Sequence, residues 1–341
     1  MKYDVTIGIP VYRSKDYIRQ TLESALAQSY PSIEYLIVDD CGYDGSLQII
    51  EEFQQNHTRG KDIRIVRHLE NQGVSASRNQ IIDEAQGAYL YFMDSDDMIS
   101  DNAIELLMQN VLRYDAEVAF GSYERVNLSG VKEVYQYPDL QLLHKDELAN
   151  FAFRKYAGIQ TSACNYLVKV SLLRDTYLRF VESDYWEDMV FTYQLVTYVS
   201  RAVLLSDITY SYFCRQGSLS HYQARDKISK QEVLQNVKTI DYLKKTAPLL
   251  YNKVYYPGYC YNVVMTDFYI ACNILKRRND IMPTISTQEI KAFMAHPTPW
   301  NQILHFKQFR IMNVFLFILG IMPVYLCVAT IWSVGKLKKI V

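Results

Sequence analysis

The sequence predicts an α/β protein: a mainly parallel sheet flanked by helices, followed by a helical C-terminal region. Two observations carry this prediction. Short apolar runs with strand character alternate with amphipathic runs through the first third of the chain, and such alternation is typical of strand–helix–strand units. From about Lys145 this alternation ends, and helical patterns dominate up to a terminal apolar segment.

The expected elements follow one another from the first residues. VTIGIPV is a strand, and residues 14–28 form a helix because Ile18, Leu22 and Leu26 fall on one face. Further strands are expected at residues 33–40, 63–68, 88–94, 116–123 and 202–213. Further helices are expected at residues 46–54, 74–85 and 100–113. We expect three parts: an α/β domain at residues 1–216 with halves 1–122 and 123–216, a helical region at 217–306, and an apolar tail at 307–341.

Composition excludes several classes of protein. Lys and Arg number 36 against 37 Asp and Glu, so no general field attracts a nucleic-acid polymer. The six cysteines are scattered without a CxxC pair, which favours buried thiols in a reducing compartment over a zinc site. The chain starts with a strand and not with a secretory signal, so nothing indicates export of the front domain.

Carboxylates follow two of the expected strands. Asp39 and Asp40 follow YLIV, and Asp94, Asp96 and Asp97 follow AYLYFM. A lone aspartate after a strand commonly starts a turn or caps a helix, and this interpretation stays open for Asp40 and for Asp97. Several acids gathered at the carboxyl ends of strands would repel one another, and a divalent cation resolves the conflict. Hard oxygen ligands together with substrate phosphates suit Mg²⁺ or Mn²⁺.

The segment NQGVSASRN opens the expected helix at residues 74–85. Its glycine precedes a helix start whose free amides can meet an anion. Ser75, Arg78 and Asn79 lie three and four positions apart, hence on one face. Arg78 alone would be read as the partner of a surface acid, but beside the aspartates we expect it to contact a phosphate.

Two later segments carry further candidates. In the WED triplet, Glu187 and Asp188 open a helix, where acids commonly meet the helix dipole. The functional interpretation makes Asp188 a general base. CRQGSLSH is a basic, hydroxyl-rich loop, in which Arg215 is a candidate for a diphosphate and His221 for the diphosphate or the metal.

Taken in order from Val5 to His221, these segments resemble glycosyltransferase family 2, the inverting enzymes of the GT-A fold. The resemblance implies a nucleotide pocket made by Pro10, Tyr12, Asp39 and Asp40. It implies that Asp94-Ser95-Asp96 is the DxD motif, with Asp96 holding the metal and Asp94 near the ribose, and that Asp188 is the base. Arg13 stands where the family often has Asn, and Trp186 where it often has Gly.

The resemblance further implies transfer of a sugar, with inversion, from a nucleotide-diphosphate sugar to a glycan or lipid-linked acceptor in cell-surface polysaccharide assembly. Acceptor specificity is expected within residues 145–212. A nicotinamide-dependent dehydrogenase would need a G-x-G-x-x-G turn, and IPVYRS has none. A sugar nucleotidyltransferase or an inactive glycan-binding relative stays open as an alternative.

The C-terminal tail suggests contact with a membrane. No charged residue occurs from Ile311 to Val334, while Lys307 and Arg310 precede this run and three lysines follow it. A single span would carry those lysines away from the cytoplasm, against the positive-inside tendency. Gly320 and Pro323 favour two short helices lying in one leaflet of the cytoplasmic face. A buried core helix is the alternative.

Overall fold

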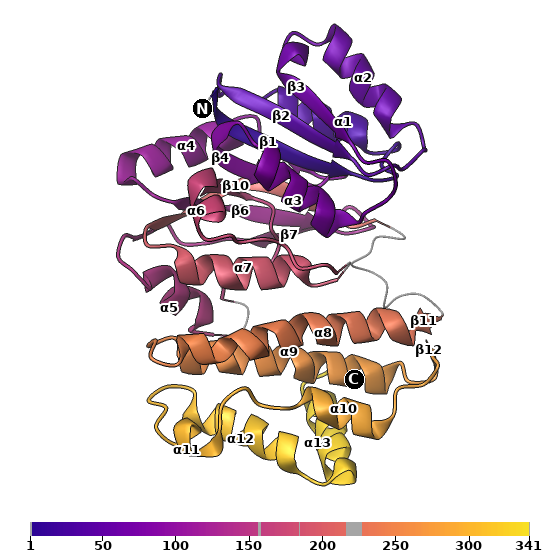
Figure 1. The fold of residues 1–341 in the computed structure, drawn as a ribbon, viewed down its shortest axis with the longest axis vertical. Helices are drawn as coiled ribbons and strands as arrows, with labels where there is room; N and C mark the ends of the chain where they lie inside the picture. The colour runs from indigo at the N-terminus through magenta and orange to yellow at the C-terminus, as the bar shows by residue number, and fades with distance from the viewer. Residues whose placement is uncertain (1, 156–157, 184, 216–226, 341) are drawn as a thin grey trace. The chain divides into compact units, whose positions relative to one another are not determined.

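The computed structural model describes residues 2–155, 158–183, 185–215 and 227–340, and the chain divides into two compact units (Figure 1). The N-terminal unit comprises residues 1–148 and 162–218, and the C-terminal unit comprises residues 149–161 and 219–341. Residues 149–161, which the sequence groups with the α/β domain, therefore belong with the C-terminal helices. Their Phe153 ring meets the edge of Tyr259 at a centroid distance of 5.1 Å.

Within the described residues, the N-terminal unit is built on one sheet of ten strands. Along its main path the order is β3-β2-β1-β4-β9-β6-β10-β5, with β7 beside β6 and β8 beside β10. The bounds are β1 Tyr3–Val11, β2 Ile33–Asp39, β3 Ile63–Arg67, β4 Gly87–Phe92, β5 Met98–Ile99, β6 Val118–Val126, β7 Lys132–Tyr135, β8 Leu140–Leu142, β9 Tyr166–Lys169 and β10 Ala202–Phe213.

The α/β prediction is confirmed, and the sheet is parallel only in its first half. Strands β1 to β4 pair in parallel, as the alternating pattern predicts. Strand β9 then runs antiparallel to both β4 and β6, and β10 returns parallel to β6. The four-residue β9 comes from a stretch without strong periodicity, so sequence reasoning placed no strand there.

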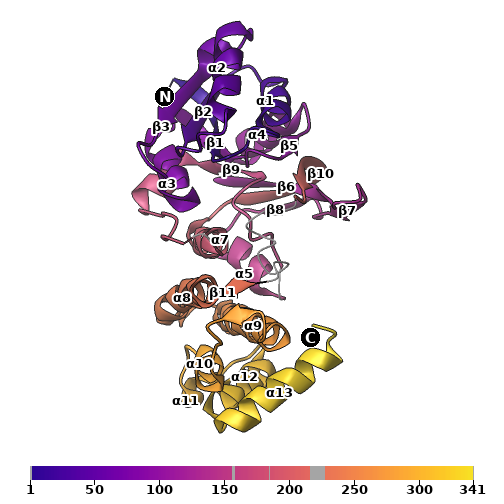
Figure 2. The ribbon, with the colours of Figure 1, turned by 90° about the vertical axis from the view of Figure 1, so that its right-hand side faces the viewer.

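Helices cover both faces of this sheet, with α3 and α7 on one side and α1 and α4 on the other (Figure 2). Their bounds are α1 Ile18–Leu26, α2 Ser46–Asn56, α3 Val74–Glu84, α4 Ala103–Tyr114, α6 Val170–Asp175 and α7 Glu187–Tyr198. Helix α3 lies directly on β1, because a Cβ atom at Gly8 would stand 2.3 Å from the side chain of Ile81. This close approach packs the second half of α3 against the middle of β1.

The C-terminal unit is helical. Its helices are α5 Glu147–Phe153, α8 Lys230–Thr246, α9 Tyr256–Lys276, α10 Thr287–Phe293, α11 Trp300–Ile303, α12 Arg310–Ile321 and α13 Val324–Leu337. Two short parallel strands, β11 Ile228–Ser229 and β12 Ile281–Met282, accompany them. Ser229 and Ser286 each begin a helix with a reciprocal capping box, in which the serine and the third helical residue, a glutamate, bond each other's backbone amides.

The uncharged run of the tail forms two helices, as Gly320 and Pro323 predict. Helix α12 ends at Ile321 and α13 begins at Val324, with Pro323 at the break between them. One face of each helix is buried in the unit through Leu316, Leu319 and Ile331. Among the described residues, no helix combines the length and apolar character needed to cross a membrane.

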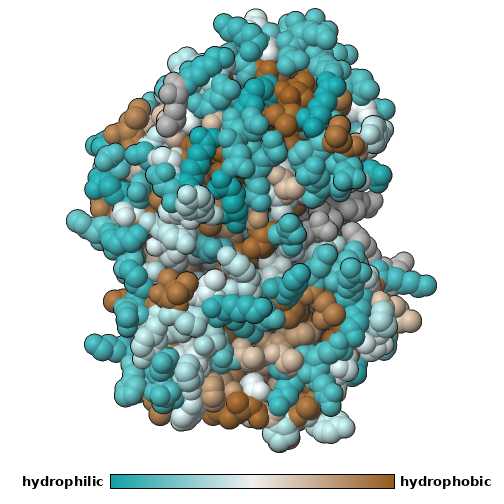
Figure 3. Space-filling model, viewed as in Figure 1, coloured by the Kyte–Doolittle hydropathy of each residue, from teal (hydrophilic) through white to brown (hydrophobic). Residues whose placement is uncertain are grey.

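The opposite face of these two helices is apolar and exposed. The residues are Ile311, Met312, Phe315, Ile318 and Ile321 on α12, and Tyr325, Leu326, Trp332 and Leu337 on α13. On α12, positions 311, 315 and 318 recur at helical spacing and form one stripe. In the space-filling view, hydrophobic side chains gather along the lower edge, where Figure 1 shows α11 to α13 (Figure 3).

A buried ion pair lies at the centre of the C-terminal unit. The amine of Lys244, on α8, contacts Asp267, on α9, and also donates to the backbone oxygen of Phe293. Asp267 is fully buried and Lys244 is 8% exposed. Burial raises the pKa of Asp267 to about 7, although the lysine opposes that shift.

We expect Lys244→Ala to lower the free energy of unfolding by about 3–5 kcal/mol, because it leaves a buried carboxylate without its counter-charge. Lys245→Ala is the matched control: this neighbour is exposed, and its loss should change stability by less than about 0.5 kcal/mol. Urea unfolding followed by tryptophan fluorescence measures both. Equal effects of the two substitutions would show that the ion pair does not stabilise the unit.

Candidate active site

Three neighbouring strands end at one edge of the sheet and bring two acidic segments there. Val11 of β1 is the register partner of Asp39 at the end of β2. On the other side of β1, the amide of Met93 donates to the carbonyl oxygen of Gly8 at 3.0 Å, just before Asp94. The carboxylates expected at strand ends therefore lie along the carboxyl edge of β1, β2 and β4, where ligands bind in open α/β sheets.

The carboxylate of Asp40 is hydrogen-bonded within a loop, residues 71–73, and stabilises it. Its carboxylate, 2% exposed, accepts from the amides of Gln72 and Gly73 at 2.8 and 2.9 Å and from Asn71 Nδ2 at 2.9 Å. His68 Nδ1 lies 2.6 Å from the same carboxylate. This network fixes the residues that lead into α3. His68 and Asn71 were not among the sequence candidates, although His68 directly follows β3 and Asn71 opens the NQGVSASRN segment.

Asp39, by contrast, keeps part of its surface open. It is only partly buried, and this burial raises the pKa of its carboxyl group. Pro10 lies across from Val38 in the ladder between β1 and β2, half-buried. Tyr12 is 43% exposed, and the guanidinium of Arg13 lies 5.1 Å from the centre of its ring. Asp39, Pro10 and Tyr12 thus share the edge of the sheet at the ends of β1 and β2.

Arg78 bridges two carboxylates from distant parts of the chain. One guanidinium nitrogen donates to Asp94 at 2.9 Å and the other to Glu187 at 2.7 Å. Arg78 is 5% exposed, and its guanidinium lies 5.4 Å from the ring centre of Phe180. Both ends of the fork are used within the protein, so the structure gives Arg78 a positioning role between the DxD segment and α7. Its predicted contact with a phosphate stays a prediction.

Ser75 and Asn79 tie the same helix to the segment that precedes α7. Ser75 Oγ donates to the carbonyl oxygen of Ser183 at 2.8 Å. Asn79 exchanges two hydrogen bonds with the backbone of Phe180, at 2.8 and 2.9 Å. The shared helical face predicted from sequence is thus present, and it holds the approach to the WED triplet in place.

The WED triplet begins α7 with an unusual backbone. Trp186 has a φ of 62°, in the left-handed region that favours glycine. This explains physically why a glycine suits this position and why tryptophan is a departure here. The turn points Glu187 toward Arg78, while Asp188 Oδ1 accepts from the amide of the following residue, Met189, at 2.7 Å.

Asp188 titrates near neutrality. Burial raises its pKa to about 7, the neighbouring charge of Glu187 adds to the rise, and Arg78 opposes it. A carboxylate poised at this value can both take and return a proton near pH 7, as a general base requires. Glu187 is held by its ion pair with Arg78, and the role of Asp188 as the base stays a prediction.

The segment after β4 carries three carboxylates, of Asp94, Asp96 and Asp97, and Asp94 is the one that pairs with Arg78. Asp97 is buried and accepts from Tyr210 Oη at 2.7 Å and from the amide of Phe213 at 2.8 Å, which ties the segment to β10. Burial and the charge of Asp94 raise the pKa of Asp96 to about 6. Arg215 donates to the backbone oxygen of Asp96 at 2.7 Å, and its guanidinium lies 4.2 Å from the ring centre of Tyr17.

Asp94 and Asp96 fit a divalent cation by their chemistry. The charge of Asp94 raises the cost of ionising Asp96, and a bound cation would lower that cost. Among the described residues, no group of three or more His, Cys, Asp or Glu side chains is placed to hold a metal. Mg²⁺ commonly takes one or two carboxylates from the protein and its other ligands from substrate phosphates and water, and Asp94 and Asp96 suit such a cation. His221, the third predicted ligand, lies outside the described residues.

Comparison with known proteins gives consistent results. Residues 6–175 match the model of glycosyl transferase family 2. Glycosyltransferase GlyA of Streptococcus pneumoniae is 30% identical over 231 residues, which cover 63% of this chain and 31% of GlyA. TarS of Staphylococcus aureus, a poly(ribitol-phosphate) beta-N-acetylglucosaminyltransferase, is 29% identical over 217 residues, which cover 62% of this chain and 35% of TarS. The chain thus matches about a third of the length of these two relatives.

Solved structures agree on the fold. TarS 1–349 in complex with UDP-GlcNAc aligns with a TM-score of 0.67 at 18% identity and covers 93% of this chain and 90% of that one. The mannosyltransferase PcManGT of Pyrobaculum calidifontis, in complex with GDP-Man and Mn²⁺, aligns with a TM-score of 0.52 at 14% identity, covering 98% and 88%. By its family model, its relatives and its sheet, the chain belongs to glycosyltransferase family 2 and has the GT-A fold.

Proposed function

We propose that the protein transfers a sugar, with inversion, from a nucleotide-diphosphate sugar to a hydroxyl of a glycan or lipid-linked acceptor during cell-surface polysaccharide assembly. The observation that carries the proposal is the buried bridge of Arg78 between Asp94 and Glu187. It couples the segment that would hold the donor to the carboxylate pair that would act on the acceptor. Relatives that act in polymer synthesis, such as TarS, support the biological setting.

The nucleotide would bind along the edge formed by Pro10, Tyr12 and Asp39. Asp39 is the partly exposed acid of its pair and suits a base that presents N–H donors, while Tyr12 offers an exposed ring. Asp40 would act indirectly, without touching the nucleotide, because its four contacts stabilise the loop that borders this edge. Ser75 and Asn79 would likewise act through the backbone that they hold.

The chemistry would be one displacement assisted by one base. Asp188 would take the proton of the acceptor hydroxyl as its oxygen forms the bond to the anomeric carbon, while the bond to the diphosphate oxygen breaks. Glu187 is held by Arg78, so a single carboxylate acts and the configuration inverts. Asp94 and Asp96 would hold Mn²⁺ or Mg²⁺, which supplies positive charge to the departing diphosphate.

Removal of the proton acceptor tests the role of Asp188. We expect Asp188→Asn to lower turnover by roughly 10²–10⁴-fold with little change in donor affinity. With wild-type protein, kcat/KM should rise with pH and level off above about 7, because only the ionised carboxylate accepts a proton. Arg78→Gln should move this rising limb of the pH profile to higher pH, by about one pH unit or more. The reason is that the positive charge that favours ionisation of Asp188 is gone.

Two controls accompany this pH experiment. Arg78→Lys keeps the charge and should move the limb less than Arg78→Gln. Arg179→Gln removes a surface arginine that pairs with Asp83, and should leave the limb in place. An active Asp188→Asn variant together with a dead Glu187→Gln variant would reverse the two roles.

Chelation tests the metal. EDTA should abolish transfer, and Mn²⁺ or Mg²⁺ should restore it. Asp96→Ala should lose turnover and also the metal-dependent part of donor binding, measured by calorimetry with the nucleotide diphosphate. Asp101→Ala, an exposed acid five residues further along, should behave as wild type. Full activity in chelator would refute the assignment.

The exposed stripe of α12 and α13 suits the surface of an anionic membrane. After Glu289 the chain contains no acidic residue, while Lys291, Lys307, Arg310, Lys336, Lys338 and Lys339 are all basic. Apolar side chains at helical spacing with cations at their flanks are typical of helices that lie in the interface. Attachment there would bring the enzyme to a lipid-linked acceptor on the cytoplasmic face.

Vesicle binding tests this attachment. Ile311→Asp and Leu326→Asp place charge on exposed positions of the stripe and should lower co-sedimentation with phosphatidylglycerol vesicles at least tenfold. Leu249→Asp is the control, since Leu249 is equally apolar and 84% exposed but lies outside the stripe. Binding that survives both stripe variants, or is absent from the wild type, would exclude this surface as the membrane contact.

A further inference from the structure

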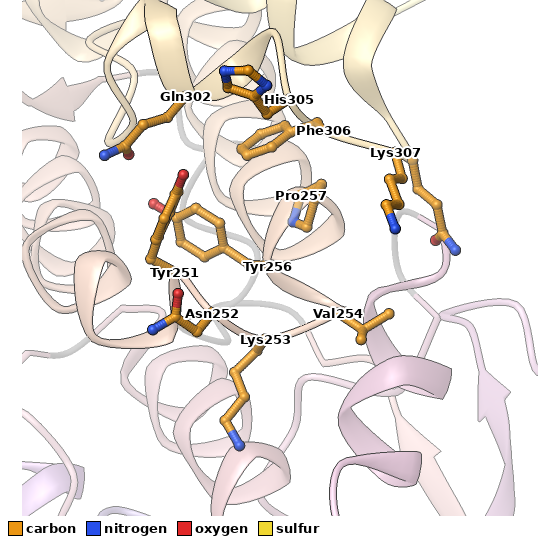
Figure 4. Close-up of a pocket in the computed structure, with 11 residues that line it drawn as sticks. Tyr251, Asn252, Lys253, Val254, Tyr256, Pro257, Gln302, His305, Phe306 and Lys307 are labelled. Atoms are coloured by element: carbon orange, nitrogen blue, oxygen red, sulfur yellow. The ribbon is translucent and has the colours of Figure 1, made fainter.

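A pocket lies within the C-terminal unit, and of the residues assigned above only Lys307 lines it. It has a volume of about 330 Å³ and is lined by residues 251–254 and 256–257, before and at the start of α9, by Gln302 on α11, and by residues 305–308 between α11 and α12 (Figure 4). This volume lies within the range of small-molecule sites. No sequence motif predicts this pocket, because its two sides are about fifty residues apart along the chain.

Three aromatic rings form a fixed wall of this pocket. The Tyr256 hydroxyl lies 2.8 Å from Thr298 Oγ1, which anchors the ring from behind. Tyr251 and Phe306 both meet Tyr256 edge to face, at centroid distances of 5.6 and 5.8 Å. Tyr256 and Phe306 are buried, whereas Tyr251 is 39% exposed and offers its ring to a ligand. The rings hold one another, so little would have to be ordered on binding.

Polar side chains from both segments surround this wall. Asn252 and Gln302 bring two amides, and His305 brings an imidazole, which Figure 4 shows beside the rings. The side chains of Asn252, Gln302, His305 and Tyr251 line the pocket and bring both donors and acceptors to it.

The kinds of polar group decide the class of ligand. Amides and a hydroxyl both donate and accept, which matches sugar hydroxyls, and the C–H face of a pyranose packs on an aromatic ring. A phospholipid headgroup would need several cations converging on one phosphate. Here Lys307 stands at one end of the pocket and the amine of Lys253 points away from the rings (Figure 4). We propose that this pocket is an accessory glycan-binding site.

Such a site would hold the acceptor chain while its end is extended. Binding at two points converts the second contact into an intramolecular one and raises the effective concentration of the acceptor end. This consequence rests on the proposed function, because it takes the bound glycan to be the acceptor. The binding itself is independent of catalysis and can be measured without a donor.

The test uses the full chain and three probes, the pentamers of glucose, N-acetylglucosamine and galactose, with saturation-transfer NMR as the readout. At least one pentamer should bind, and Tyr251→Ala or Gln302→Ala should weaken that binding about tenfold. Tyr242→Ala is the matched control, a 40% exposed tyrosine on α8 that does not line the pocket, and should bind as wild type. Donor hydrolysis, assayed on the same preparations, should be unchanged in all three variants.

The other outcomes each have a meaning. If no pentamer binds, or if the pocket variants bind as well as wild type, the accessory site is refuted. If the variants instead lose binding to phosphatidylglycerol vesicles, the pocket is a lipid headgroup site and the glycan assignment is wrong. Loss of donor hydrolysis in the wild type would contradict the proposed function and leave the binding result standing by itself.

Discussion

The guanidinium of Arg78 is buried between Asp94 and Glu187, residues that lie 16 and 109 positions away in the chain. A buried arginine that lost both partners would leave its charge without compensation, at a cost of several kcal/mol. The end of β4, helix α3 and the start of α7 are therefore held together. Other features of the site agree with this constraint: Ser75 and Asn79 hold the approach to α7, and the Glu187 carboxylate is held in an ion pair.

The pKa values of the site follow from the same arrangement. Asp188 lies next to Glu187 and near Arg78, so its pKa of about 7 is a balance of burial, a like charge and an opposite charge. Asp96 experiences burial and the charge of Asp94, with Arg215 opposing them. The pKa values of these two acids are thus raised by the same kinds of effect, exerted by different neighbours. One would serve the acceptor and the other a cation.

The sequence predicted the parallel half of the sheet and the edge that carries the acids, because both depend on local periodicity and strand order. It also predicted the break between α12 and α13 from Pro323. It did not predict β9, whose four residues carry no periodic signal, or the commitment of Asp40 to the loop. The ion pair of Arg78 with Glu187 could not be predicted from the sequence either, since pairing across 109 residues depends on the folded chain. The pocket beside Tyr251 is hidden for the same reason.

The charge along the chain is distributed unevenly. Residues 290–341 carry six basic and no acidic side chains, so the net charge of −1 for the whole chain leaves −7 on the first 289 residues. Such a polypeptide is an electric dipole despite its near-neutral total. At low ionic strength the cationic end of one copy will attract the anionic part of another, whereas at about 0.15 M salt the Debye length falls to about 8 Å and this attraction is screened. Purified protein should accordingly be handled in salt, and its apparent size in dilute buffer should depend on salt concentration.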